Sequence, residues 1–310
     1  MKLSRTRTAQ DAWTAIALDG RRLDIARMQT GVGQRPRLSV FSTIQCEPEV
    51  PSTLRRVAKE LRLEKGRINA LLPHGDYDLL PVEAPEVPAE ELRTAVRWRL
   101  KDVLEYPPED ATIDVLPLPQ SPSPAGRAAQ LIAVATRSER IASCIELFDG
   151  ARLALSAIDI HEMAQRNVAA LFEEGERAVA MVSFSDKRGL LTVSAKGQLY
   201  LARNLEIGTE VMERTAAEAR SGLMDRLALE LQRSLDHFDR QFGGLQVSRL
   251  LVTPFAQADA LRVVLAESLY VAVEILDLAR VIDLDGVPAL RDPEAQGRHV
   301  RVIGAALRSL

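Results

Sequence analysis

Cysteine, aromatic residues and excess positive charge are all scarce in this sequence of 310 residues. The two cysteines, Cys46 and Cys144, form no CxxC pair, so a reducing compartment is the default expectation, although one long-range bridge stays open. Aromatic residues make up 4% of the chain and the net charge is −3. A nucleic-acid partner is therefore not expected, because such proteins carry a basic surface or stacked aromatic side chains.

Long apolar runs are also lacking. No stretch approaches the roughly 18 uncharged apolar residues that a transmembrane helix needs. The N-terminus, MKLSRTRTAQDAW, is basic but is followed by no apolar segment of the kind found in secretion signals. We therefore expect a cytoplasmic protein, which another protein would have to hold at a membrane if it works there.

The common catalytic motifs are missing as well. The sequence has no GxxxxGK[ST] phosphate-binding loop and no GxSxG elbow. Its four histidines occur singly, without the spacing that places two metal ligands on one helix face; they are His74, His161, His237 and His299. The motifs thus predict no catalytic residue and no metal site.

Two similar hairpins are the clearest positive signal. Residues 15–28 read AIALDGRRLDIARM and residues 180–193 read AMVSFSDKRGLLTV, and in each case two apolar runs flank a polar turn that contains glycine. Each hairpin is followed by alternating helix and strand patterns. With 46% hydrophobic residues, the chain is predicted to form an α/β protein of two similar lobes.

Further elements follow from periodicity and capping signals. Apolar residues recur every three or four positions along residues 210–242, which predicts one long helix with a buried stripe at Leu223, Leu227, Leu231, Leu235, Phe238 and Phe242. Residues 88–104 predict another helix, with Trp98 opposite its apolar stripe. The stretch 70–118 has no counterpart in the second half and is predicted to be an inserted subdomain, and the proline-rich stretch 117–126 a loop.

Four strings resemble one family. DYDLLPVEAPEVPAEELRTAVRWRLKDVLEYPPEDATIDVLPLP (76–119) closely resembles the inserted region of MshI-like pilus-biogenesis proteins. The resemblance continues in SAIDIHEMAQRNVAALF (156–172), ELQRSLDHFDRQF (230–242) and IGAALR (303–308). The wider superfamily includes PilM and, more distantly, FtsA.

The resemblance implies an α/β, actin-like (ribonuclease-H-like) fold of two lobes, with a small α+β subdomain inserted in the first. The expected boundaries are 1–170 for the first lobe, including an insert at about 70–120, and 171–310 for the second lobe. In ATP-binding members of the superfamily, the tips of the two hairpins hold the phosphates and the metal.

Those nucleotide motifs are altered here. Ala17 and Asp19 stand where the resemblance expects the acidic residue and the glycine of the first hairpin. Ser183 and Ser185 replace the corresponding pair in the second hairpin. In the third element, a glycine pair is replaced by residues 253–255, Thr-Pro-Phe, in which proline offers no N–H group.

We therefore expect a degenerate cleft with no catalytic residue and no cofactor. The alternative is an actin-like ATPase that still binds ATP with Mg²⁺ and hydrolyses it slowly. The residues that would then contact the nucleotide are Asp19, Gly20, Ser183, Ser185 and Gly304.

The resemblance also implies a partner. It predicts a scaffold of a type IV pilus machine, of the mannose-sensitive haemagglutinin type, that lies on the cytoplasmic side of the inner membrane. The scaffold would bind the cytoplasmic tail of a PilN-like bitopic protein in a groove between the first lobe and the insert. Other pilus assembly proteins are further expected partners. The sequence leaves open whether the chain forms a homo-oligomer. Candidate groove residues are Tyr77, Val82, Pro85, Trp98, Tyr106 and Pro107.

Overall fold

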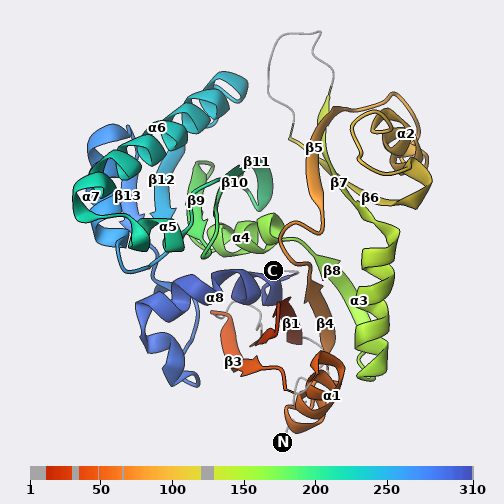
Figure 1. Ribbon diagram of the computed structural model, residues 1–310. Helices are drawn as coiled ribbons and strands as arrows, with labels where there is room; N and C mark the ends of the chain where they lie inside the picture. Colours follow the sequence, from red (N-terminus) through yellow and green to blue (C-terminus); the bar gives the residue numbers. More distant parts are fainter. Residues whose placement is uncertain (1–11, 30–34, 48, 65, 120–128, 309–310) are drawn as a thin grey trace, which may run out of the picture.

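The computed structural model describes residues 12–29, 35–47, 49–64, 66–119 and 129–308. These residues form two five-stranded sheets and one three-stranded sheet. Figure 1 shows three bodies: the first sheet at the bottom, the second sheet at the upper left and the small sheet at the upper right. Two helices, α4 (His161–Ala170) and α8 (Pro293–Ala306), lie in the centre between the two larger bodies.

The first sheet has the strand order β3-β2-β1-β4-β8. Its first three strands are antiparallel and its last two are parallel to β1. Helices α1 and α3 cover one face, where Leu54 and Phe148 join a shared apolar cluster, and α8 packs on the other. The elements are β1 (Ala12–Asp19), β2 (Arg22–Gln29), β3 (Arg37–Gln45), α1 (Val50–Glu60), β4 (Arg67–Leu71), α3 (Ser138–Gly150) and β8 (Leu155–Asp159).

The second sheet repeats this topology with the order β11-β10-β9-β12-β13. The predicted stripe of the long helix is buried against it, as expected. The helix predicted at 210–242 is interrupted, because Thr215 and Ala216 are extended and Arg220 donates to the carbonyls that end α5. The elements are β9 (Ala178–Phe184), β10 (Gly189–Ala195), β11 (Gln198–Leu205), α5 (Thr209–Arg214), α6 (Ala217–Gln241), β12 (Val247–Val252), α7 (Ala258–Ser268) and β13 (Ala272–Ile275).

The third sheet belongs to the inserted region and has the order β5-β7-β6. Its central strand is β7, so the sheet reaches past the limit of about residue 120 expected for the insert. Helix α2 is shorter than the predicted 88–104, because short-range bonds such as Val103 N–H to Leu100 O turn the chain after it. The elements are β5 (Asp78–Glu83), α2 (Leu92–Arg99), β6 (Ala111–Pro117) and β7 (Gln130–Arg137). The proline-rich loop lies largely outside the described residues.

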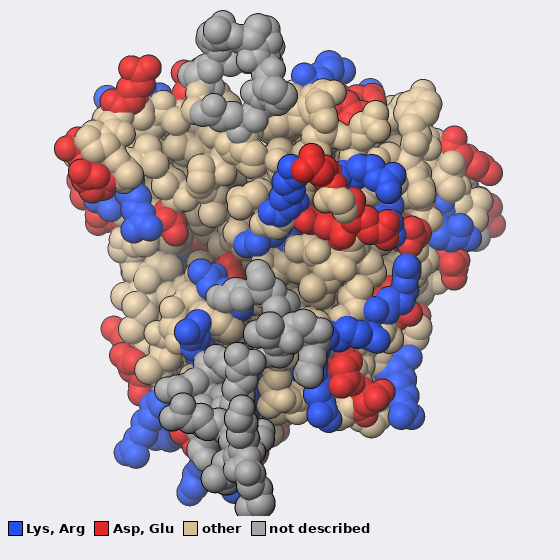
Figure 2. All heavy atoms as spheres, turned by 180° about the vertical axis from the view of Figure 1, so that it is seen from behind, with Lys and Arg blue, Asp and Glu red and all other residues tan. Residues whose placement is uncertain are grey.

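Three short 3-10 helices complete the description: η2 (Pro108–Asp110), η3 (Leu278–Arg280) and η4 (Pro288–Arg291). None of the helices in the described part of the chain combines the length and the apolar character that a membrane crossing requires. Cys46 and Cys144 are both free. Figure 2 shows acidic and basic side chains interspersed over the back of the molecule.

Candidate functional site

The tip of the first hairpin is held by charged side chains of the protein itself. Asp19 is exposed, and the Arg22 guanidinium lies between Asp19 and Asp24, at 3.1 and 3.2 Å from their carboxylates. Gly20 adopts a φ of +58°, the left-handed geometry that a tight hairpin turn requires. The tip therefore makes a turn with its own ion pairs.

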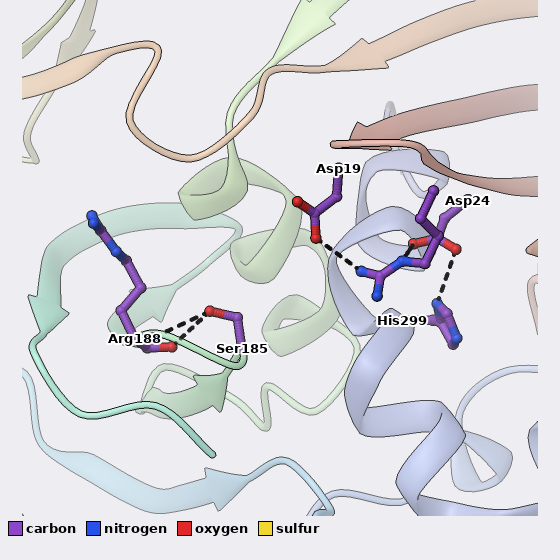
Figure 3. A network of polar contacts seen from close by, with 6 residues as sticks. Asp19, Asp24, Ser185, Arg188 and His299 are labelled. Atoms are coloured by element: carbon purple, nitrogen blue, oxygen red, sulfur yellow. Dashed lines mark hydrogen bonds and ion pairs between the residues drawn. The ribbon is translucent and has the colours of Figure 1, made fainter. Parts of the chain in front are cut away.

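Asp24 is the buried member of this group. His299 of α8 lies 3.6 Å from its carboxylate, and Figure 3 shows this imidazole pointing to Asp24. Burial alone raises the pKa of Asp24, but His299, then Thr43 and then Arg22 favour the charged carboxylate, and the balance lies below the ordinary value. The buried carboxylate behind the first tip is therefore already paired within the chain.

The tip of the second hairpin is held by hydrogen bonds within its own turn and from the start of helix α5. The Ser185 hydroxyl donates to the Arg188 carbonyl oxygen at 2.9 Å. The first backbone N–H groups of α5, on Thr209 and Glu210, donate to the carbonyls of Ser185 and Asp186. In Figure 3 the dashed contacts join Ser185 with Arg188, join Asp19 with Asp24 through an arginine and join Asp24 directly with His299, but none links the two groups. The helix end beside this tip is thus occupied by backbone carbonyls.

Ser183 is fully buried and has an arginine beside it. Its hydroxyl donates to Gln165 Oε1 and accepts from Arg301 Nη2 at 3.1 Å. Gln165 Nε2 in turn donates to the carbonyls of Met181 and Leu190, which belong to the two strands of the hairpin. A guanidinium of α8 therefore occupies the space in front of the residue that the resemblance assigns to metal or phosphate binding.

Gly304 lies where helix α8 crosses helix α4. A Cβ atom at this position would lie 2.0 Å from the carbonyl oxygen of Ala164, and at Gly297, two turns earlier on the same helix, 1.9 Å from the carbonyl oxygen of Pro254. The Gly304 carbonyl accepts from Asn167. The absence of side chains at these two glycines lets α8 approach α4 and the second lobe closely.

The third nucleotide element is filled by aromatic rings. Phe255 packs against Phe184 of the second hairpin with ring centroids 5.2 Å apart. Pro254, which precedes Phe255, is the residue that contacts Gly297. Apolar and backbone groups of the chain thus take the place of the expected glycine pair.

A buried polar group lies where the insert leaves the first lobe. The Tyr77 hydroxyl donates to Glu162 Oε2 at 2.7 Å and accepts from the backbone N–H of His161 at 3.1 Å. Burial raises the pKa of both Tyr77 and Glu162, since each charged form would lose solvation. The strand connection that enters the insert is therefore fastened to the first turn of α4.

Replacing Glu162 with glutamine should change the pH dependence of stability. The folded-state pKa of Glu162 lies above its ordinary value of 4.5, so the folded chain binds the extra proton and stability falls as pH rises above 4.5. In Glu162→Gln this loss is absent. Urea unfolding from pH 4.5 to 8 should show the variant gaining stability relative to the wild type, and a constant difference would contradict the assignment.

A cavity of about 300 Å³ adjoins this group. Its lining comes from the start of the insert, from the second hairpin and from β11. The lining residues are His74, Gly75, Tyr77, Asp78, Leu79, Leu80, Glu162, Arg188, Ala202, Arg203 and Asn204. Arg188 is the one tip residue of the second hairpin in this lining.

The residues at and near the two hairpin tips fit a Mg²⁺-nucleotide poorly. Within the described ranges, no group of three His, Cys, Asp or Glu side chains could hold a metal ion. Asp24 is paired, and Ser183 accepts from Arg301, whose positive charge opposes a nearby cation. Of the five predicted nucleotide contacts, only Asp19 and Gly20 share one turn, while Ser183 and Gly304 are buried in packing contacts.

The six predicted partner contacts do not form one surface. Tyr77 is buried against α4, while Val82 and Tyr106 pack against the small core of the insert. The Tyr106 ring also lies under the guanidinium of Arg137, 4.4 Å away. Pro85 is partly buried; Trp98 and Pro107 are exposed, Trp98 by 58%.

Sequence reasoning missed Arg301, Gln165 and the Tyr77–Glu162 pair. Each contact joins positions that lie 18 or more residues apart, up to 118 for Arg301 and Ser183, so no local pattern reveals it. Gly297 and Gly304 did carry a signal: small residues seven apart on one helix indicate a close helix crossing.

Comparison with solved structures identifies the fold. A protein of Bacteroides thetaiotaomicron described as having an actin-like ATPase fold and unknown function matches with a TM-score of 0.50 and 11% identity, covering 89% of this chain and 94% of that one. The repeated sheets and the crossing helices α4 and α8 agree with that class. The chain has the actin-like, two-lobed α/β fold that the sequence predicts.

Two further structures are similar over nearly the whole chain. A PilM-PilN type IV pilus biogenesis complex matches with a TM-score of 0.70 and 21% identity, covering 95% of this chain and 97% of that one. The cytoplasmic domain of EpsL, an inner-membrane component of the type II secretion system of Vibrio cholerae, matches with a TM-score of 0.51 and 14% identity, covering 87% and 91%. No protein-family model and no curated protein matches the sequence.

Proposed function

We propose that this chain is an assembly scaffold of a type IV pilus machine, of the mannose-sensitive haemagglutinin type, and that it works at the cytoplasmic face of the inner membrane. One observation carries the proposal: the fold agrees over 95% of the chain with that of a PilM-PilN type IV pilus biogenesis complex. The match with the cytoplasmic domain of a secretion-system component supports the same kind of role.

The proposed partner is the cytoplasmic tail of a PilN-like membrane protein. Its docking region is the junction of the insert and the first lobe, where apolar side chains from both bodies meet. Leu79, Leu116 and Val134 of the insert are partly buried there, next to Ile141 and Met163 of helices α3 and α4. A tail with apolar side chains would bury these residues further and gain hydrophobic stabilisation.

Trp98 on α2 is the proposed anchor for a part of the tail that extends beyond the junction. It is 58% exposed, and exposed tryptophan is enriched among the residues that dominate binding energies at interfaces. Trp98→Ala should weaken binding of a synthetic PilN-like tail about 30-fold while leaving the melting temperature nearly unchanged. Titration calorimetry with the full chain measures this.

Tyr270→Ala is the matched control, because Tyr270 is 94% exposed and lies on the second lobe. Its affinity for the tail should equal that of the wild type. If the folded wild-type protein does not bind the tail, the proposed function is wrong. If Trp98→Ala binds the tail as tightly as the wild type does, only the role of Trp98 as an anchor is wrong.

A second candidate function is an actin-like ATPase that binds ATP with Mg²⁺. The fold favours it, but the residues near the hairpin tips do not, because Asp24 is paired with Arg22 and Ser183 accepts from Arg301. It predicts that millimolar Mg-ATP raises the melting temperature, since a ligand that binds only the folded state stabilises that state.

A further inference from the structure

The cavity between the lobes is built mainly from polar groups on opposite walls. Tyr77, Asp78 and Glu162 lie on the wall made by the insert and α4. Arg188 and Arg203 lie on the wall made by the second lobe. At about 300 Å³, the cavity is at the lower end of the sizes typical for small-molecule sites.

Arg188 brings an uncompensated charge to this cavity. Arg188 as a residue is partly buried, and no described residue offers its side chain a hydrogen bond or an ion pair, although its backbone is bonded within the hairpin turn. Figure 3 shows the side chain extending away from Ser185 and from the acidic group at the first tip. A guanidinium that lines a cavity and has no counter-ion of its own attracts an anion into that cavity.

Arg301 adds a second guanidinium nearby. Its guanidinium donates to the Ser183 hydroxyl. The carboxylate that interacts with its charge is Glu162, which accepts a hydrogen bond from Tyr77. Burial lowers the pKa of Arg301; Tyr77 and Glu162 oppose this shift, and the like charge of Arg188 adds to it. Among the lining residues the charges of Asp78 and Glu162 balance those of Arg188 and Arg203, and Arg301 behind them adds one positive charge.

His74 lies close to the same two arginines, Arg188 and Arg301. Both of its ring nitrogens are buried, and neither has a described partner at hydrogen-bond geometry, although the side chain of Asn204 lies close enough to raise its pKa slightly. Burial lowers its pKa to about 4, with Arg301 and Arg188 adding repulsion. The imidazole is therefore neutral at physiological pH and has an N–H group available to donate to a ligand oxygen.

We propose that this cavity binds an oxyanion, a phosphate or a carboxylate group, through Arg188 with Arg301 behind it, and that it does so without a divalent metal. Guanidinium groups match the geometry of both kinds of anion and supply the charge that a metal would otherwise bring. The acidic residues near the cavity are too few and too well paired to hold a metal in their place. The site goes beyond the proposed scaffold function and does not depend on it.

The test is titration calorimetry of the full chain with pyrophosphate and, separately, with succinate. EDTA is present throughout and sodium chloride keeps the ionic strength constant. We expect saturable binding of one or both probes, at least about fivefold weaker in Arg188→Gln and intermediate in Arg188→Lys. Arg226→Gln, which removes the same charge from an exposed position on α6, should bind as the wild type does.

Comparison of pyrophosphate with succinate shows whether the cavity prefers a phosphate or a carboxylate ligand. Absence of saturable binding for both, a strict requirement for Mg²⁺, or equal affinity in Arg188→Gln and wild type would overturn the proposal. Each variant is also unfolded with urea, so that a loss of folding is distinguished from a loss of the site. Tail binding by Arg188→Gln, measured alongside, keeps this result separate from the proposed scaffold function.

Discussion

Gly304→Ala should destabilise the protein by about 3 kcal/mol or more. The new Cβ atom would lie 2.0 Å from the carbonyl oxygen of Ala164 and 2.7 Å from its carbonyl carbon. Both obstacles are backbone atoms of α4, which no side-chain rotation can move away. Helices α4 and α8 would have to separate, and because each packs under a different lobe, the whole interlobe core would loosen.

Gly222→Ala is the matched control for this prediction. Gly222 lies within α6, and a Cβ atom there meets nothing within 4 Å. Because alanine is a better helix former than glycine, this variant should be unchanged or more stable by about 0.5–1 kcal/mol. Urea unfolding of both variants measures the difference. Equal stabilities would mean that the two helices do not cross as closely as described.

Gln165→Leu should be the second most damaging change, at roughly 3 kcal/mol. The amide of Gln165 is fully buried and serves both strands of the second hairpin, through the carbonyls of Met181 and Leu190 and the hydroxyl of Thr192. It also accepts from Ser183. Leucine fills a similar volume but leaves these polar atoms without the amide, and an unsatisfied buried polar group is costly.

The control here is Gln198→Leu, because Gln198 is exposed at the start of β11. Its free energy of unfolding should stay within about 0.5 kcal/mol of the wild type. Thermal or urea unfolding reports both values. If Gln165→Leu were as stable as this control, the buried amide would not be what holds α4 to the second hairpin.

The architecture was predictable because its signals are local. Alternating apolar runs around Gly20 and Gly189 specify hairpins, and the three-to-four spacing of the stripe in α6 specifies its buried face. The two lobes follow from the repeat of these patterns. The break between α5 and α6 was missed, because no proline or glycine marks the extended residues Thr215 and Ala216.

The chemistry of the site was only partly predictable. The sequence pointed to the altered positions Ser183 and Ser185, but it could not show that Arg301, 118 residues beyond Ser183, reaches that hydroxyl. It also placed Gly304 near a ligand, whereas the structure places this glycine in a helix crossing. Such contacts depend on how the lobes pack, and packing between distant segments leaves no periodic signal in one sequence.

The framework of the fold and the tips of its two hairpins differ in how well they match an ATP-binding protein. The strands and crossing helices of an actin-like fold are present, while the hairpin tips are closed by Arg22, Ser185 and the first turn of α5. Groups that would contact phosphate or metal in an ATP-binding relative are satisfied within the chain. This contrast favours the proposed scaffold over an ATP-binding protein.

The most direct test of this account is calorimetric titration of the full chain with a PilN-like cytoplasmic tail, with and without millimolar Mg-ATP. The account predicts binding in the micromolar range, worth about 8 kcal/mol, with the same affinity in both conditions and no shift of the melting temperature by Mg-ATP. Tail binding that appears only with Mg-ATP, or no binding by folded protein, would contradict it.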